Sequence, residues 1–203
     1  MSETCYAQKE RILNYKNDIK REIEESLDVK RHLLSECIDD INKAAEMLID
    51  ALRENKKIYL CGNGGSASDC QHIACELVGK LRKKSISVPA FSLVTNISAL
   101  TALANDFGYE NIFSKQLAVY AHAGDILIAL STSGKSLNVI KAAEFAKKHN
   151  IKIVVMTGKK ETPLSRMADL AIMVPSDDTP RIQESHILIG HILALIIEKV
   201  VNR

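Results

Sequence analysis

The stretch that decides the fold reads KIYLCGNGGSASD, residues 57–69. Its first part is apolar and short, as expected of a buried strand, and its second part is a turn rich in glycine, asparagine and serine that leads into a helix. Backbone N–H groups at the positive end of a helix can hold an anionic or sugar-like ligand. The stretch therefore predicts a strand–loop–helix unit with a ligand cradle in its loop.

The rest of the chain repeats this alternation of strand and helix. Apolar runs lie at 58–61, 88–94, 125–130, 151–156 and 170–174, and helical patterns lie at about 66–81, 98–104, 110–121, 136–149, 163–168 and 180–201. Strands that are apolar throughout are buried on both faces, which is typical of a parallel sheet between helices. We therefore expect one α/β domain spanning 1–203, with a three-layer core over 56–203 built on a parallel five-stranded sheet.

Residues 1–55 are predicted to form a helical extension. From Leu34 to Leu52 apolar residues recur every three or four positions, which indicates an amphipathic helix ending near Asn55. The apolar seams of the first and last helices are long for a monomer of this size. They either pack on their own sheet or pair with a second subunit, and the sequence leaves both possibilities open.

Composition narrows the class of partner. The chain has 27 basic and 25 acidic side chains, a balance that argues against a nucleic-acid binder. Its basic cluster, Lys80, Arg82, Lys83 and Lys84, is either a solvated helix end or a phosphate-attracting patch. The N-terminus lacks a signal-peptide pattern, the apolar run 187–197 is too short to cross a bilayer, and the five cysteines show no CxxC spacing. We expect a cytoplasmic protein with no membrane partner.

A second candidate ligand loop, STSGKS at residues 131–136, follows the third strand. Ligands of parallel sheets bind beyond the carboxyl ends of the strands, and hydroxyl and helix N–H groups there could surround a phosphate monoester. An ordinary capping loop has the same composition. A nucleotide-binding P-loop is disfavoured because Ala129 stands where its first glycine is required, and a dinucleotide site is disfavoured because the second apolar run ends without an acidic residue.

Reactive side chains gather on two of the predicted helices. His72 and Glu76 lie one turn apart on one helix face, a spacing used by zinc sites and by acid–base pairs, although a surface ion pair has it too. The last helix carries His186 and His191, of which at least one is expected to face the ligand. Gln183 and His191 are about 12 Å apart along an ideal helix, so one metal could join them only through long reach, a bend or a neighbouring subunit. Cys70 and Cys75 are interpreted as small buried residues.

Four ordered blocks, at 61–77, 100–117, 124–142 and 174–193, resemble the phosphoheptose isomerases of the sugar isomerase (SIS) family. The resemblance covers nearly the whole chain. It implies a Rossmann-like SIS fold, a homotetramer with active sites at subunit interfaces, and conversion of D-sedoheptulose 7-phosphate to D-glycero-D-manno-heptose 7-phosphate in the synthesis of bacterial heptosides such as lipopolysaccharide or capsule.

The resemblance also implies roles for individual residues. Glu76 and His191 are the expected catalytic pair, acting as base and as acid/base partner through an enediol. One zinc ion per subunit is expected on His72, Glu76, Gln183 and His191. The expected substrate contacts are Asn63, Gly64, Gly65, Glu76, Asn105, Asp106, Ser131, Thr132, Ser133, Ser136 and Gln183.

Two departures from the family pattern and two rival functions remain. Lys80 stands where an arginine is common, and Val94-Thr95-Asn96-Ile97 replaces the usual sugar-facing stretch. One rival is a non-catalytic SIS scaffold resembling the initiator-binding protein DiaA, and another is a sugar-phosphate sensor. Retention of Glu76 and His191 favours the enzyme.

Overall fold

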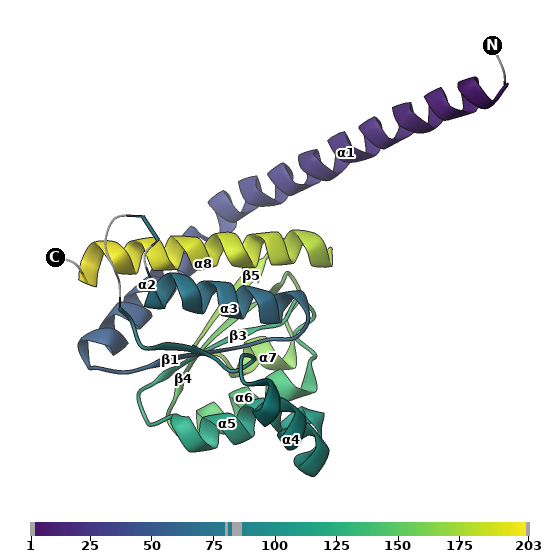
Figure 1. Ribbon diagram of the computed structural model, residues 1–203. Helices are drawn as coiled ribbons and strands as arrows, with labels where there is room; N and C mark the ends of the chain where they lie inside the picture. The colour runs from purple at the N-terminus through teal and green to yellow at the C-terminus, as the bar shows by residue number, and fades with distance from the viewer. Residues whose placement is uncertain (1–2, 80, 83–86, 202–203) are drawn as a thin grey trace.

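The computed structural model describes residues 3–79, 81–82 and 87–201 (Figure 1). Of the basic cluster considered above, Lys80, Lys83 and Lys84 lie outside the described residues, and Arg82 is exposed. Lys80 as a departure from the family pattern therefore stays untested.

The sheet has the five parallel strands that the apolar runs predict. They are β1 (Ile58–Cys61), β2 (Ala90–Ser92), β3 (Ile126–Leu130), β4 (Lys152–Gly158) and β5 (Leu170–Val174), in the order β2-β1-β3-β4-β5. In the central register, Ile128 pairs with Leu60 on one side and Val154 on the other. The chain leaves β1 toward one edge and returns through β3 toward the other, so the crevice where open α/β sheets bind ligands lies at the carboxyl ends of β1 and β3.

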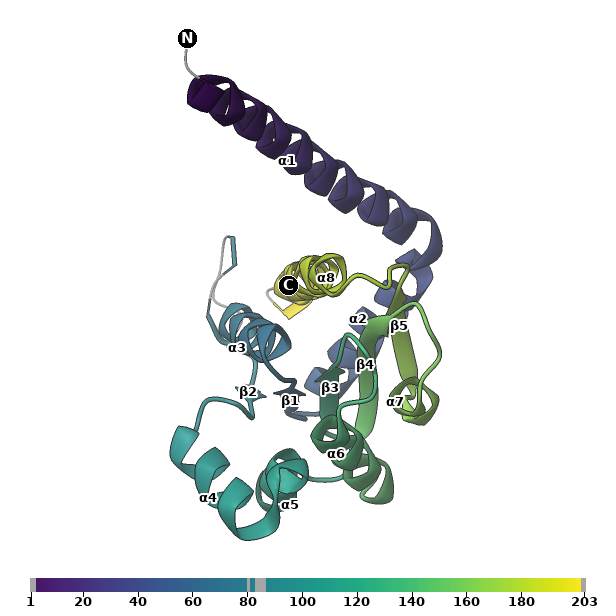
Figure 2. The same ribbon diagram turned by 90° about the vertical axis from the view of Figure 1, so that its right-hand side faces the viewer.

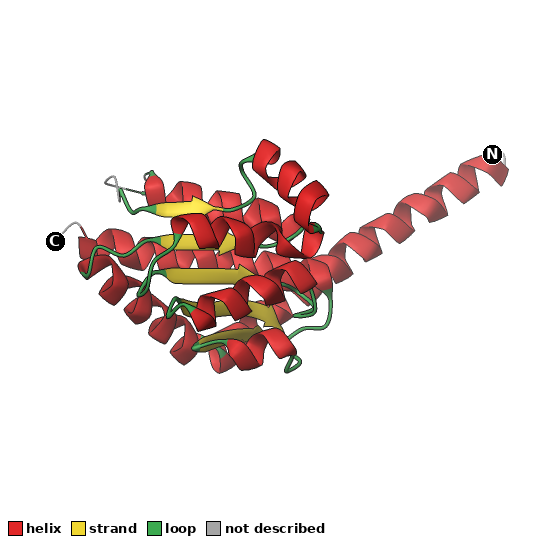
Figure 3. Ribbon diagram, turned by 90° about the horizontal axis from the view of Figure 1, so that it is seen from below, coloured by secondary structure: helices red, strands yellow, loops and turns green. Residues whose placement is uncertain are grey.

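Helices cover both faces of the sheet and give the three layers (Figure 2). On one side lie α2 (Ile38–Arg53), α3 (Gly65–Val78) and α8 (Thr179–Val201), and on the other α5 (Ile112–Tyr120), α6 (Leu137–Lys148) and α7 (Pro163–Met167). Figure 3 shows the strands between these two groups. Every residue of β1 and β3 is buried, which explains their unbroken apolar sequence.

Several predicted boundaries shift for local reasons. The second strand is shorter than 88–94 because the chain turns at Ser92, whose carbonyl accepts bonds from both the amide and the hydroxyl of Thr95. The helix predicted at 98–104 is longer, α4 (Ile97–Phe107): the Asn96 side chain caps its start at Ala99 N–H, and the helix continues until Gly108, which has φ of +85°. The segment predicted as helix 110–121 begins as a 3-10 turn, η1 (Tyr109–Asn111), and continues as α5.

The helix predicted from Leu34 to Asn55 is wrong as one element. It breaks at Cys37, where α1 (Glu3–Glu36) ends and α2 begins. Cys37 is buried, and its Sγ lies 3.4 Å from the carbonyl of Met173 on β5, so the break ties this point to the sheet. On the N-terminal side of this break, α1 projects from the rest of the chain (Figure 1).

The long apolar seams of α8 and α1 differ in burial. The seam of α8 packs on its own sheet, with Ile189, Leu193 and Ile197 buried. The seam of α1 is exposed within the chain at Tyr15, Ile19, Ile23, Leu27 and Leu34. Among the described helices, none combines the length and hydropathy needed to span a membrane.

Candidate active site

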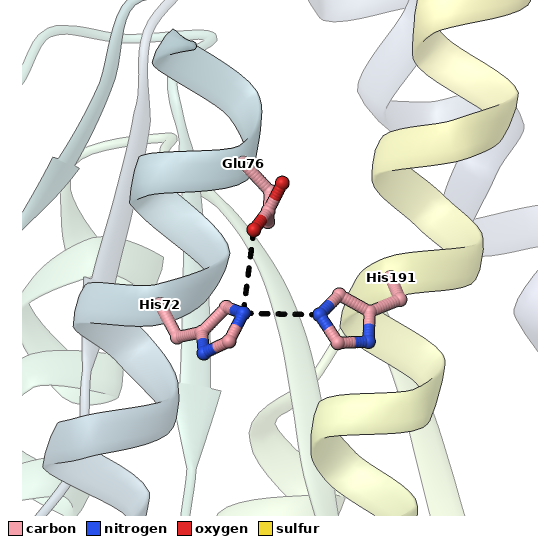
Figure 4. Close-up of side chains that lie close together, drawn as sticks. All are labelled: His72, Glu76 and His191. Atoms are coloured by element: carbon pink, nitrogen blue, oxygen red, sulfur yellow. Dashed lines mark hydrogen bonds and ion pairs between the residues drawn. The ribbon is translucent and has the colours of Figure 1, made fainter. Parts of the chain in front are cut away.

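Three reactive side chains that the sequence singled out meet at one point. His72 and Glu76 come from α3 and His191 from α8 (Figure 4). His72 Nε2 lies 3.3 Å from Glu76 Oε1 and 3.1 Å from His191 Nε2. One ligand atom from each of the three residues lies within 4.8 Å of the others. Of the two histidines of the last helix, His191 is the one that meets this pair, and a single chain suffices to bring the three together. That it faces the ligand stays a prediction.

Close packing of two helices makes this meeting possible. Figure 1 shows α3 and α8 side by side, and a methyl group placed on Gly190 of α8 would overlap the side chain of Ile73 on α3. Ile73 follows His72, and Gly190 precedes His191. This close contact therefore lies next to the two imidazoles and limits the distance between them.

The donor set of this cluster suits a metal ion. The two Nε2 atoms face each other, and a direct hydrogen bond between them needs one ring to donate and the other to accept. Two imidazoles and a carboxylate converging on one point are typical ligands of zinc. The amide of Gln183, expected as a fourth ligand, lies against Gly65, since a Cβ on Gly65 would be 2.5 Å from Gln183 Nε2.

The loop after β1 has the geometry of a ligand cradle. Gly64 has φ of +56°, in the left-handed region that favours glycine, and both Gly64 and Gly65 are exposed. The first backbone bonds of α3 run from Ala67 and Ser68, to Asn63 and Gly64. Within the described part of the chain the N–H groups of Gly65 and Ser66 thus have no backbone acceptor, which fits an anionic or sugar-like ligand.

The second candidate ligand loop, residues 131–136, is held by contacts of its own. Ser131 Oγ lies 3.2 Å from Ser136 Oγ, and Gly134, with φ of +60°, packs against Thr162. Ser136 occupies the N-cap of α6, but its side chain makes no capping bond.

The anion-binding expectation for this loop is supported by free donors. In the resolved ranges of the chain, no acceptor faces the backbone N–H groups of Ser136, Leu137 and Asn138 at the start of α6. The loop lines a cavity of about 300 Å³ whose wall includes Thr132, Ser133 and three lysines, namely Lys135, Lys159 and Lys160. The same wall holds the carboxylates of Glu161 and Asp177, and Asp177 pairs with both Lys159 and Lys160. The free N–H donors, with Lys135 nearby, are therefore what favours a phosphate group here.

Two further residues expected to contact the substrate lie on α4. Asn105 and Asp106 are exposed on α4, where Asn105 Nδ2 donates to Asp106 Oδ1 at 2.9 Å. Among the described residues no bond joins either one to His72, Glu76 or His191. Their role in binding substrate stays a prediction.

The structure adds two polar residues that the sequence reading missed. Asn138 of α6 and Tyr109 of η1 both bond the side chain of Asn63. Asn138 has only its closeness to the 131–136 loop as a signal, since asparagine early in a helix usually means a local backbone bond. Tyr109 is distant in sequence from both ligand loops.

One cysteine interpretation was wrong. Cys70 is fully buried, but Cys75 is exposed and lines the open groove of about 700 Å³ that also contains His72 and Glu76. Burial raises the pKa of the Cys61 thiol to about 12 and that of Cys70 well above its usual value. Those two thiols are therefore inert at neutral pH.

Two ionisable groups behind the site have shifted pKa values. Burial raises the pKa of Asp69 to about 6, opposed by the charge of His72. Burial lowers the pKa of His186 to about 4, opposed by the backbone of Thr157. His186 is fully buried, and neither of its ring nitrogens has a hydrogen-bond partner of good geometry in the described residues. It is thus a neutral residue of the core, whereas His191 meets His72 and Glu76.

Comparison with known proteins shows which family the chain resembles. The profile of the SIS domain matches residues 23–158. The chain is 48% identical over 186 residues to the phosphoheptose isomerase of Sulfurimonas denitrificans, covering 91% of this chain and 95% of that protein. It is 44% identical over 183 residues to that of Helicobacter pylori, covering 90% and 95%.

The chain belongs to the phosphoheptose isomerase family of SIS-domain proteins. A solved member of this family, phosphoheptose isomerase GmhA from Neisseria gonorrhoeae, superposes with a TM-score of 0.87 at 36% identity, over 92% of this chain and 100% of that one. The one from Francisella tularensis gives 0.85 at 32% identity, over 90% and 97%. The expected SIS fold is confirmed.

The approach of α3 and α8 yields a first prediction. Gly190→Ala should weaken binding of Zn²⁺, a probe suited to two imidazoles and a carboxylate, by about 10- to 100-fold, because the added methyl pushes His191 from His72. Competition with a chromophoric chelator measures the affinity. Adding Ile73→Ala, which vacates the space, should restore most of it. Wild-type affinity in Gly190→Ala alone would contradict this account.

His186 yields a second prediction, on pH. Its pKa is about 4 in the folded chain and about 6.5 when unfolded, so between these values the unfolded state binds more protons. The stability it contributes is therefore present above pH 6.5 and is lost as the pH falls toward 4. The unfolding free energy of the wild type minus that of His186→Gln should grow by about 3 kcal/mol as the pH rises from about 4 to about 6.5. Urea unfolding at each pH measures it, and a difference independent of pH would refute it.

Proposed function

We propose that this chain is an aldose–ketose isomerase that converts D-sedoheptulose 7-phosphate to D-glycero-D-manno-heptose 7-phosphate. The observation that carries the proposal is the convergence of Glu76 with His72 and His191. The loops after β1 and β3 add free backbone N–H donors that suit a sugar phosphate. Its relatives bear the name of that activity. A non-catalytic scaffold of the DiaA kind, or a sensor, has no need of a carboxylate and two imidazoles held together.

The isomerisation moves one proton between carbons and another between oxygens. In our scheme Glu76 removes a proton from C1 of the ketose, which gives an enediol, and returns a proton to C2. His191 moves the oxygen-bound proton between the C1 and C2 oxygens. Both groups stand close enough to act on one pair of adjacent carbons, because their ligand atoms lie within 4.8 Å.

We further propose one zinc ion per subunit, held by His72, Glu76 and His191 with Gln183 as a fourth ligand. Such an ion, when bound, supplies a Lewis acid for the two reacting oxygens. The chain's own contribution is to hold the imidazoles and the carboxylate at a single point through the packing of α3 on α8.

The substrate is proposed to lie across the carboxyl ends of β1 and β3. The hydroxyls of the 131–136 loop and the N–H groups of α6 would hold the phosphate, which fixes the reacting carbons in place. The full set of proposed contacts is Asn63, Gly64, Gly65, Glu76, Asn105, Asp106, Ser131, Thr132, Ser133, Ser136 and Gln183.

We propose that residues 1–203 form a single domain and that the chain assembles as a homotetramer. The support is the exposed stripe on α1, where Tyr15, Ile19, Ile23 and Leu27 recur every fourth residue on a helix that projects from the chain. A contiguous apolar stripe of this kind typically marks a protein contact. A cytoplasmic place in the synthesis of heptose for lipopolysaccharide or capsule would follow from the activity.

Removing the proposed base provides the third prediction. Glu76→Gln should lower kcat with sedoheptulose 7-phosphate by about 10²- to 10⁴-fold, since the amide cannot accept the carbon-bound proton. A coupled assay measures turnover, and in D₂O the wild-type product should carry deuterium at C2.

The matched control is Glu144→Gln, which changes an exposed carboxylate on α6. Its kcat should equal that of the wild type, and circular dichroism should show both variants folded. Retention of wild-type kcat in Glu76→Gln would exclude the scheme.

Disrupting the α1 stripe provides the fourth prediction. Charges at two of its positions, in Ile19→Glu with Ile23→Glu, should shift the protein to a smaller species, because an apolar contact would have to bury carboxylates. Sedimentation velocity measures the shift, with Lys20→Glu on the exposed polar side as control. Unchanged sedimentation of the double variant would show that α1 takes no part in assembly.

A further inference from the structure

Asn63 and Asn138 form a closed pair of amides. Asn63 Nδ2 donates to Asn138 Oδ1, and Asn138 Nδ2 donates to Asn63 Oδ1, both at 2.8 Å. Asn138 is 2% exposed and sits in the first turn of α6. The pair therefore joins the loop after β1 to the helix that follows the phosphate loop.

The orientation of this pair is determined by the backbone. Val139 N–H donates to Asn138 Oδ1 at 3.0 Å, so that oxygen must face α6 and the NH₂ group must face Asn63 Oδ1. Turning the Asn63 amide over would set NH₂ against NH₂ and oxygen against oxygen. Asn138 thus fixes which atom of Asn63 points which way.

Tyr109 completes the arrangement from a third segment. Its hydroxyl donates to Asn63 Oδ1 at 2.9 Å, although the residue is 59% exposed. The turn that carries Tyr109 is held on α6 by Lys141, whose Nζ lies 3.3 Å from Asn111 Oδ1 and 3.5 Å from Glu110 Oε1. Both acceptor positions of Asn63 Oδ1 are then filled by donors from the protein.

One donor of Asn63 remains. The amide carries two N–H groups, one of which bonds Asn138, and within the described residues no protein group accepts the other. With its oxygen fully engaged, Asn63 can offer a ligand only this N–H. It would meet an oxygen atom and repel another donor.

We propose that Asn138 and Tyr109 are positioning residues that orient Asn63 so that it presents an N–H donor to an oxygen of the bound sugar phosphate. The inference rests on the proposed function for the identity of that ligand. The same contacts couple the sugar-binding loop to the phosphate loop through α6, so the two ends of the substrate are held at a fixed separation. Neither residue touches the reacting carbons.

The isosteric change Asn138→Asp tests the inference. It replaces the donor facing Asn63 Oδ1 with an oxygen, so neither orientation of Asn63 satisfies the pair. KM for sedoheptulose 7-phosphate should rise by about 10- to 100-fold, whereas kcat should fall by less than about threefold, because binding and not chemistry is affected. A role confined to stability would leave KM of the folded fraction unchanged, and that result overturns the proposal.

A double-mutant cycle separates positioning from direct contact. If Asn138 acts through Asn63, adding Asn138→Asp to Asn63→Ala should change KM by less than about twofold further. Additive effects of the two changes would overturn the proposed route. Tyr109→Phe should raise KM by about 2- to 10-fold, with Tyr120→Phe, on another exposed tyrosine, as the matched control.

A crystal structure of Asn138→Asp distinguishes failure of this inference from failure of the proposed function. A wild type that does not turn over sedoheptulose 7-phosphate ends the proposed function, and the position of the Asn63 side chain then decides the inference alone. Displacement of Asn63 in the variant supports positioning, and an Asn63 that keeps its place refutes it.

Discussion

The close approach of α3 and α8 is the constraint on which the site depends. A glycine at position 190 lets the backbone of α8 lie against Ile73, and the residues next to this contact are the two imidazoles. A side chain at 190 would separate the helices and with them His72 and His191. Helix packing distances depend on the side chains at the contact, so a single hydrogen atom in place of a side chain has a large effect here.

Substrate binding in this account depends on a second constraint, the order of the strands. Because β1 and β3 are neighbours whose connections leave in opposite directions, their loops open toward a common crevice. Each loop ends in a helix whose first N–H groups lack backbone acceptors in the described chain, so both can offer donors. The amide pair of Asn63 and Asn138 then holds the two loops together, which makes the crevice one site with two ends.

Sequence reading predicted most of the fold for clear physical reasons. Strands buried on both faces are apolar throughout, so all five runs were found, and β1 and β5 were predicted to the residue. The break at Cys37 could not be predicted, because periodicity continues through it and only the contact with Met173 reveals the change of direction. The length of β2 depends on a turn at Ser92 that leaves no mark on the apolar pattern.

The site was predictable in part for the same kind of reason. His72 and Glu76 are close in sequence, so helical geometry places them together. Periodicity alone does not separate His191 from His186, because that depends on which face of α8 meets α3, and only the family resemblance indicated His191. Cys75 faces the groove and not the core, which its neighbours in sequence do not indicate. Tyr109 and Asn138 become visible only when three segments separated along the chain are brought to Asn63.

The central claim is that the carboxylate of Glu76 and the imidazole of His191 from one chain act on one molecule of substrate. A crystal structure with sedoheptulose 7-phosphate bound tests this most directly. The account predicts Glu76 beside C1 and C2 and His191 beside the oxygens of the same two carbons, with the phosphate in the 131–136 loop. A ketose that touches only one of the two residues, or that lies with its phosphate elsewhere, would contradict it.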